Sequence, residues 1–361
     1  MRVLQLIDSL QTGGAERIAV NFANALVGKI EKSYLCSTRQ EGLLKESIGN
    51  EVNYIFLKKT KTLDFKALKR LKVYIKKNNI DIIHAHSSSY FFAVLLKLSG
   101  SKVKIVWHDH YGGSEFLQNR KYKVLRLCSN YFSHIFSVNT ILENWAKKYL
   151  NANSVSYLPN FALQTESKEK TVLYGKSGKR IIHLANLRPQ KDHLTLLDAF
   201  NEIVKQYPEW TLHCVGKNFN DDYFYDIEQK IDDLNLNKNV FLYGSKSDIT
   251  NILKQCDIAV LSSKSEGLPV ALLEYGLSKL PVVVTNVGDC SKVVINKESG
   301  FIVEKNNYVA LSDAISLLIE DTTLASKFKI ELYNKVLKEY SNQSVVRLLV
   351  SKYQTIINYE K

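Results

Sequence analysis

Residues 258–274 read IAVLSSKSEGLPVALLE and contain a complete strand, a loop and the start of a helix. The apolar run 258–261 predicts a buried strand, because a strand that is covered on both faces is apolar throughout. Pro269 suits the first position of a helix, where its missing N–H costs nothing. The segment therefore predicts a strand that leads through a glycine-containing loop into a helix, which is the repeating unit of a parallel α/β sheet.

The same alternation of short apolar runs and helix-like segments extends along the whole chain. We expect strands at 3–8, 81–85, 104–108, 135–138 and 155–158, and then at 180–184, 210–215, 240–242, 258–261 and 281–285. The polar segment 164–179 lacks apolar periodicity and predicts a linker. The chain should therefore be an α/β protein with two Rossmann-like, doubly wound domains that face each other across a cleft, with ligands beyond the carboxyl ends of the strands.

The loop within residues 258–274 has the features of an anion site. Gly267 allows a ligand to approach the backbone, and the following helix offers free N–H groups and the positive end of its dipole. We expect the backbone of Gly267 and Leu268 to bind a diphosphate, with Glu266 and Glu274 holding sugar and ribose hydroxyls on either side. The alternative is one glutamate that favours a helix start and a second that is only solvated.

Two further loops follow predicted strands and contain candidate phosphate-binding groups. Arg188 and Lys191 could neutralise a departing diphosphate; alternatively, they are a solvated pair, although cations are unfavourable at a helix start. Gly14 opens the helix after the first strand and permits close approach of a donor phosphate or an acceptor. This turn does not match G-x-G-x-x-G, and no acidic residue ends the second strand, so a nicotinamide cofactor is disfavoured.

Histidines gather at the ends of two predicted strands, where His84 and His86 precede His108 and His110 along the chain. Such a group could hold a metal, but the chain has no D-x-D triplet to carry a metal-bound diphosphate, and we expect no metal. The five cysteines form no C-x-x-C pair, which favours buried thiols in a reducing compartment over disulfides.

The positive charge is confined to the first half of the chain. Residues 1–165 contain 24 Lys and Arg against 11 Asp and Glu, so this half accounts for the whole net charge of +13. Such asymmetry predicts an anionic partner for one domain, either a membrane or nucleic acid.

Two basic amphipathic stretches, 58–77 and 119–127, favour the membrane. The apolar face of the first stretch consists of Leu68, Leu71 and Ile75. The alternative is that each apolar stripe packs on the sheet. No run approaches the ~18 apolar residues that a spanning helix needs, and the N-terminal run is too short for a signal peptide. We therefore expect a soluble or surface-bound protein.

Residues 266–274, EGLPVALLE, resemble the E-x7-E motif of retaining glycosyltransferases, and nearly the whole chain resembles glycosyltransferase family 4. The resemblance implies the two-domain GT-B architecture. It also implies that Glu266 contacts the donor sugar, that Glu274 binds ribose, and that the backbone of Gly267 and Leu268 holds the diphosphate.

Other segments of the family match less completely. The family wording R-L-x-x-x-K has Asn186 in place of its arginine, so we expect Arg188 to substitute for it beside Lys191. His108 resembles the family's cleft histidine, which contacts the sugar near the reacting carbon. Gly244 and the adjacent Ser245 stand where the family places the base.

The resemblance also extends to the two ends of the chain. Residues 13–17, GGAER, are similar to a segment common in family 4, which supports the assignment of Gly14. The final helix of this architecture crosses back onto the first domain. We therefore expect an acceptor-binding domain of residues 1–163 plus 343–361 and a donor-binding domain of residues 164–342.

The implied function is retaining transfer of a sugar from a nucleotide-diphosphate-sugar, a UDP-sugar in preference to a GDP-sugar, onto a lipid-linked or saccharide acceptor. The nucleotide-sugar is a substrate, and no cofactor is expected. We expect the enzyme in the cytoplasm, peripheral on the inner face of the plasma membrane, where it would build cell-surface polysaccharide, and we expect no nucleic-acid partner. The alternatives are a nucleotide-sugar epimerase of the same fold and a basic nucleic-acid-binding protein.

Overall fold

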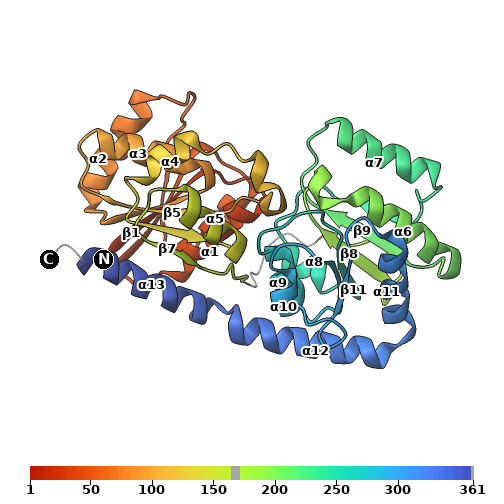
Figure 1. Ribbon diagram of the computed structural model, residues 1–361. Coiled ribbons are helices and arrows are strands. Elements are labelled where there is room, and N and C mark those ends of the chain that lie inside the picture. Colours follow the sequence, from red (N-terminus) through yellow and green to blue (C-terminus); the bar gives the residue numbers. More distant parts are fainter. Residues whose placement is uncertain (164–170, 359–361) are drawn as a thin grey trace. The chain divides into compact units, whose positions relative to one another are not determined.

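The computed structural model describes residues 1–163 and 171–358 (Figure 1). The chain divides into two compact units, Met1–Phe161 with Asn342–Lys361 and Ala162–Ser341. The first part of the predicted linker, 164–170, lies outside the described residues. Each unit contains one parallel sheet with helices on both faces, and the prediction of two Rossmann-like α/β domains is confirmed.

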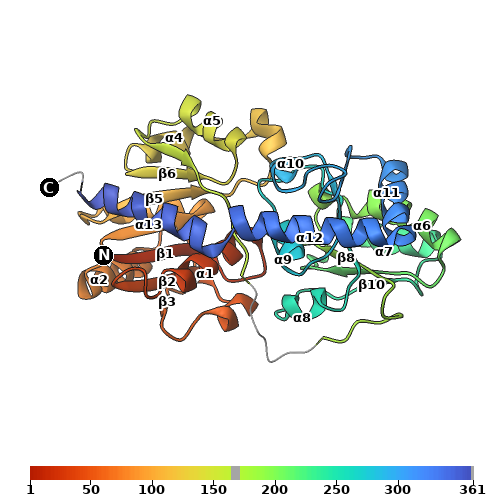
Figure 2. The ribbon, with the colours of Figure 1, turned by 90° about the horizontal axis from the view of Figure 1, so that it is seen from below.

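The sheet of the first unit has the strand order β3-β2-β1-β4-β5-β6-β7, and its strands pair in parallel. The strands are β1 (Arg2–Ser9), β2 (Lys32–Gln40), β3 (Asn53–Phe56), β4 (Ile82–His86), β5 (Lys104–Asp109), β6 (His134–Ser137) and β7 (Val155–Tyr157). The helices are α1 (Gly14–Ala25), α2 (Phe65–Asn78), α3 (Tyr90–Leu98), α4 (Lys123–Ser129), α5 (Thr140–Tyr149) and α13 (Asn342–Asn358). Figure 2 shows these strands side by side, with the C-terminal helix α13 running along this unit.

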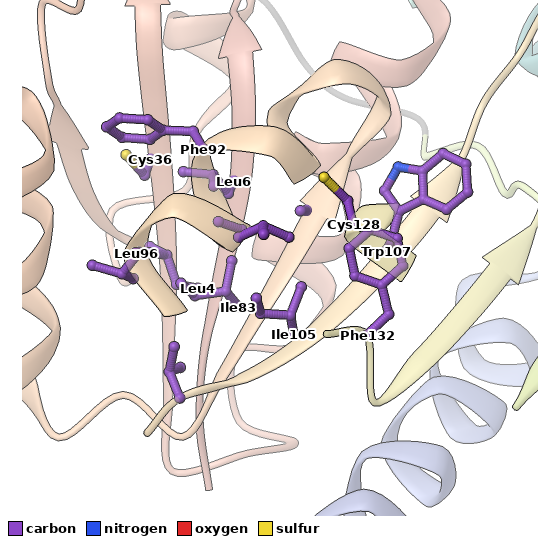
Figure 3. Close-up of a cluster of buried hydrophobic side chains, with 14 of the residues drawn as sticks. Leu4, Leu6, Cys36, Ile83, Phe92, Leu96, Ile105, Trp107, Cys128 and Phe132 are labelled. Atoms are coloured by element: carbon purple, nitrogen blue, oxygen red, sulfur yellow. The ribbon is translucent and has the colours of Figure 1, made fainter. Parts of the chain in front are cut away.

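Side chains alternate between the two faces of this sheet, as the period of two along a strand requires. Leu4 and Ile83 point to the face that α2, α3 and α4 cover, and they belong to a large apolar cluster there (Figure 3). Gln5 and His84 point to the opposite face, where Tyr353 of α13 contacts both of them. Most of the histidines therefore lie on the α1 and α13 side of the sheet.

The second unit repeats the arrangement with the strand order β10-β9-β8-β11-β12-β13, also in parallel. Its strands are β8 (Arg180–Leu184), β9 (Thr211–Val215), β10 (Val240–Leu242), β11 (Ile258–Leu261), β12 (Val282–Thr285) and β13 (Phe301–Val303). Its helices are α6 (His193–Gln206), α7 (Asp222–Asp233), α8 (Ile249–Leu253), α9 (Val270–Leu277), α10 (Cys290–Val293), α11 (Tyr308–Glu320) and α12 (Thr322–Glu339), and the short 3-10 helix η4 (Pro189–Lys191) follows β8. Because the order reverses between β8 and β11, the loops after these two strands are the expected ligand site of this fold.

The apolar stripe of α2 does not face outward. Leu71 is fully buried, Ile75 is 6% exposed, and Leu68 packs against the same cluster. The stretch 58–77 therefore uses its predicted lipid-facing stripe to cover the sheet, which was the stated alternative. The outer surface of α2 is formed by its lysines, together with the exposed Phe65 and Val73.

Candidate active site

The carboxylate of Glu266 is the centre of the candidate site in the second unit. Glu266 follows β11 and is 5% exposed. Its Oε1 accepts a hydrogen bond from Lys191 Nζ at 2.5 Å and another from Ser263 Oγ at 2.6 Å. The structure therefore brings together two predicted site residues that are 75 positions apart in the sequence.

Two loops are fastened together around this ion pair. Ser262 Oγ, after β11, donates to the carbonyl of Lys191 at 3.0 Å. The amide of Lys264 donates to the carbonyl of Gln190 at 2.8 Å, and its ammonium lies 3.0 Å from Oδ1 of the buried Asp192. These contacts fix the backbone that positions Lys191.

A third loop supports the backbone on which we expect the diphosphate to bind. Gly288 has a φ of +54°, and a Cβ at this position would lie 2.4 Å from the carbonyl oxygen of Glu266 and 2.5 Å from that of Gly267. The amide of Asp289 donates to the Gly267 carbonyl at 2.9 Å. Only glycine satisfies both the left-handed conformation and this close approach.

The helix after this loop begins one residue later than expected. Pro269 is the N-cap, with φ −71° and ψ 122°, and α9 starts at Val270 without a hydrogen bond from a capping side chain. The first N–H groups and the positive end of the dipole can therefore receive an anion. Leu268 is buried, and Glu274 is partly buried in the helix, about 6 Å along the axis from Val270.

Arg188 is placed differently from Lys191. Its guanidinium lies 4.6 Å from the centre of the Phe219 ring, and its side chain is exposed. Lys217 lies over the same ring at 5.1 Å. The substitution of Arg188 for the family arginine therefore stays a prediction, which requires the side chain to leave Phe219.

The predicted base site follows β10. Gly244 has a φ of +65°, and its carbonyl accepts a hydrogen bond from the amide of Gly216 at 3.0 Å. Gly216 lies against the loop after β8, because a Cβ there would be 2.0 Å from the carbonyl oxygen of Ala185. Gly244 and the partly exposed Ser245 thus lie at the same edge of the sheet as Lys191, and their role in base binding stays a prediction.

Gly14 is the first residue of α1 and is exposed. A Cβ at Gly14 would meet no atom within 4 Å, whereas a Cβ at the N-cap, Gly13, would lie 2.2 Å from a carboxylate oxygen of Glu16. The Glu16 side chain is flexible and could move away from a Cβ at Gly13, and the surface of Gly14 is open to a ligand.

His108 lies inside the first unit. It is fully buried, and neither of its ring nitrogens has a hydrogen-bond partner among the described residues. Its ring centre lies 4.1 Å from that of His110, which is partly exposed and comes directly after β5. Burial lowers the pKa of His108 well below its usual value and that of His110 to about 3, so both rings are neutral. The predicted sugar contact therefore suits His110 better, because only this ring offers a surface.

Ligand atoms of His84, His86 and His108 lie within 4.8 Å of one another. The ring of His84, however, is stacked on that of His86 at 16° and on that of His108 at 18°. Nitrogen lone pairs lie in the ring planes, so near-parallel rings do not aim them at a common point. Both nitrogens of His86 are also hydrogen-bonded. The arrangement favours packing over metal coordination.

Arg120 is a further residue whose place the sequence did not reveal. Its two terminal nitrogens donate to both carboxylate oxygens of the buried Asp109 at 2.7 and 2.8 Å. The guanidinium lies 4.4 Å from the centre of the Tyr111 ring and 4.2 Å from that of Trp145. Arg120 was predicted to belong to a lipid-facing stretch, and this is wrong because the side chain is used to fix the loop after β5.

Two family models match consecutive parts of the chain. "Glycosyltransferase Family 4" matches residues 12–162, and "Glycosyl transferases group 1" matches residues 164–335. An uncharacterized glycosyltransferase of Haemophilus influenzae is 25% identical over 326 residues, which are 86% of this chain and 88% of the relative. A UDP-Gal:alpha-D-GlcNAc-diphosphoundecaprenol alpha-1,3-galactosyltransferase of Escherichia coli is 29% identical, with 72% of each chain covered.

A capsular polysaccharide biosynthesis glycosyltransferase of Staphylococcus aureus is 24% identical over 84% of this chain and 87% of its own length. Among solved structures, Anabaena HepE in complex with UDP and glucose has a TM-score of 0.81 and covers 98% of this chain and 100% of its own. At 18% identity, HepE shows the shared fold alone.

Proposed function

We propose that this chain, which belongs to the family 4 glycosyltransferases of the GT-B fold, moves a sugar from a UDP-sugar to a lipid-linked saccharide. We propose further that the transfer retains the configuration at the anomeric carbon. That it is a glycosyltransferase follows from its family, and the epimerase alternative is not supported by the relatives. The proposal depends most directly on the buried ion pair of Lys191 and Glu266, three residues before the N-cap of α9.

The ion pair can couple binding of the donor to the availability of the Glu266 carboxylate for a sugar hydroxyl. Glu266 neutralises the charge of Lys191 in this ion pair. A diphosphate at the start of α9 would compete for this ammonium, and Arg188 would supply a second positive charge. Glu266 would then be able to accept a hydrogen bond from a hydroxyl of the donor sugar.

Retention requires no covalent intermediate in this arrangement. The acceptor hydroxyl attacks the anomeric carbon on the face from which the diphosphate leaves, and a phosphate oxygen takes its proton. Lys191 and the amides of α9 stabilise the negative charge on the leaving diphosphate. Within the second unit, Glu266 orients the sugar, while Glu274 would hold ribose and the loop at Gly244 and Ser245 would hold the base.

The outer surface of α2, α3 and α4 in the first unit is the structural feature that supports a lipid-linked acceptor. These three helices contain nine basic residues and no acidic residue. Large apolar side chains are exposed among these charges, namely Phe65, Val73, Leu98, Val124 and Leu127. Basic and apolar groups that alternate on one surface favour an anionic lipid interface. We call this surface the basic–apolar layer.

The Escherichia coli relative is named for an acceptor on diphosphoundecaprenol and for a UDP-linked donor, and the Staphylococcus aureus relative for capsule synthesis. These names support a polyprenyl-linked acceptor, a UDP-sugar and a role in cell-surface polysaccharide. Among the described residues no helix combines the length and the apolar character needed to cross a bilayer. We propose that the enzyme works on the cytoplasmic face of the membrane, held by the basic–apolar layer.

A thermal-shift screen with UDP-, GDP- and ADP-sugars tests the donor, because a ligand that binds only the native state raises the melting temperature. We expect stabilisation by a UDP-sugar and UDP release when a polyprenyl-diphosphate-linked sugar is added. The same measurements on the variant Glu266→Gln test the role of this carboxylate. Glu298→Gln, at an exposed loop position of the second unit, is the control for that variant. Absence of stabilisation by every UDP-sugar would contradict the proposed donor.

A further inference from the structure

A chain of buried hydrogen bonds connects His110 to the C-terminal helix. Nε2 of His110 lies 2.9 Å from Nδ1 of His86, and Nε2 of His86 lies 2.8 Å from Oε1 of Gln5. The Gln5 amide nitrogen donates to the hydroxyl of Tyr353 at 3.4 Å, and this hydroxyl lies 2.5 Å from Nδ1 of His84. The four members other than His110 are fully buried.

The Gln5 amide sets the direction of these hydrogen bonds. A carbonyl oxygen has no hydrogen, so Nε2 of His86 must carry the proton in its bond to Oε1 of Gln5. A neutral imidazole has a single N–H, and Nδ1 of His86 is therefore an acceptor that requires a proton on Nε2 of His110. Burial lowers the pKa of His86 well below its usual value, which keeps this ring in the neutral form.

We propose that Gln5 and His86 are positioning residues that hold His110 as the Nε2–H tautomer and so present its Nδ1 as a hydrogen-bond acceptor. The inference builds on the proposed function, because the group that meets this nitrogen would be a hydroxyl of a saccharide. A phosphate oxygen without a proton would be a poor partner for it. The relay thus favours sugar over diphosphate at His110.

Tyr353 secures the other end of the relay. Its hydroxyl can donate its own hydrogen to Nδ1 of His84 while accepting from the Gln5 amide. This contact is satisfied when the oxygen of the Gln5 amide is towards His86, as it is in the structure. If the amide were rotated by half a turn, every bond would reverse and Nδ1 of His110 would carry the proton.

The tautomers can be read directly by 15N NMR of the full-length protein labelled at histidine, because protonated and bare ring nitrogens resonate far apart. We expect His86 and His110 as Nε2–H tautomers in the free protein. A proton on Nδ1 of His110 would overturn the proposal. His134 serves as the internal control, because it bonds to Ser154 and Ser156 and lies outside the relay.

Two substitutions at Gln5 separate the relay from a general effect on packing. Gln5→Leu removes the acceptor, and His110 should then populate both tautomers while the His134 signals stay in place. Gln5→Glu keeps an acceptor for Nε2 of His86 and should restore the single tautomer. An unchanged His110 tautomer in Gln5→Leu would rule out the positioning role.

A matched pair at His110 tests the acceptor itself. The side-chain oxygen of Asn can occupy the place of Nδ1, whereas the longer Gln reaches the place of Nε2. We expect His110→Asn to keep about tenfold more of the wild-type kcat/KM than His110→Gln. Equal losses would contradict the acceptor role. The NMR result needs no substrate, so failure of the proposed transferase reaction would be recognised separately.

Discussion

Lys191 Nζ and Glu266 Oε1 lie 2.5 Å apart in a largely buried ion pair, although they come from loops after different strands. Lys191→Met should lower kcat/KM by roughly 100- to 1,000-fold, because it removes charge stabilisation of the leaving diphosphate. Steady-state kinetics and calorimetric titration with UDP measure this. Glu266→Gln should give a comparable loss, and the double variant should lose much less than the product, because both residues act as one unit. Unchanged UDP affinity in Lys191→Met would contradict the diphosphate role.

Glu274→Gln should weaken UDP binding by about tenfold, the loss expected for a charge-assisted hydrogen bond. The sharper test compares UDP with 2′-deoxy-UDP by calorimetry. Wild-type protein should prefer UDP, because the Glu274 carboxylate is the proposed partner of the ribose hydroxyls. The Glu274→Gln variant should lose this preference. Glu298→Gln should keep it. A preference for UDP that survives in Glu274→Gln would place ribose elsewhere.

Gly288→Ala should destabilise the second unit and reduce UDP affinity together. The new Cβ would lie 2.4 Å from the Glu266 carbonyl oxygen, in addition to the strain of a positive φ, and we expect a cost of at least about 1–3 kcal/mol. Gly178→Ala is the matched control, since Gly178 has a φ of +85° and no atom within 4 Å of a Cβ. It should lower the melting temperature less and leave UDP affinity unchanged.

Four exposed lysines of α2 allow a test of the basic–apolar layer that spares the core. The residues to change to glutamine are Lys66, Lys69, Lys76 and Lys77. At about 1 kcal/mol per charge near a surface, sedimentation with anionic vesicles should fall at least a hundredfold, while thermal stabilisation by UDP is retained.

The control for this test changes four exposed lysines of the second unit, Lys176, Lys238, Lys254 and Lys327. This control should sediment like the wild type. Phe65→Ser with Leu127→Ser should also reduce vesicle binding, but without lowering its salt dependence. Preferential binding of short DNA at the same ionic strength would favour nucleic acid as the anionic partner.

The folded protein should lose stability as the pH falls from about 6.5 towards about 3. Burial, and secondarily the charge of Lys352, lowers the pKa of His134 to about 3. The unfolded chain therefore binds a proton that the folded chain excludes, and the free energy of unfolding decreases with falling pH. His134→Gln should remove about 2 kcal/mol of the decrease between pH 7 and pH 5. Urea unfolding at pH 7 and pH 5 measures this difference. If the free energy of unfolding depended on pH in the same way in His134→Gln and in the wild type, the prediction would be contradicted.

The strands and the loop 262–268 could be predicted because their signals are local. The strands β2, β3 and β13 were missed. In β2, the residues Ser33, Ser37 and Thr38 break the apolar pattern. These residues are nevertheless buried, because neighbouring groups take up their polar atoms; the Ser33 hydroxyl, for example, donates to the carbonyl of Ala23 at 2.6 Å. In the sequence, a Ser or Thr whose buried hydroxyl is hydrogen-bonded in this way cannot be distinguished from a polar loop residue.

The errors at the candidate site arise because the order of residues does not show which side chains pack against each other in the folded chain. His108 lies in β5 and His110 directly follows this strand, and the packing of Phe22 and His84 against the His108 ring shows that His108 is the covered one. The stripe of Leu71 and Ile75 fits a lipid surface and a sheet equally well. Arg120 looked like a surface charge, because its partner Asp109 is eleven positions away.

The first unit is assembled from two segments that are far apart in the sequence, since Asn342–Lys361 belong with Met1–Phe161. During synthesis, Gln5 and His84 therefore emerge long before Tyr353, which completes their hydrogen bonds. This unit must wait for translation of α13 before its core can close. A nascent chain arrested before α13 would leave the part of this sheet face around Gln5 and His84 exposed, and we expect such a chain to bind a chaperone.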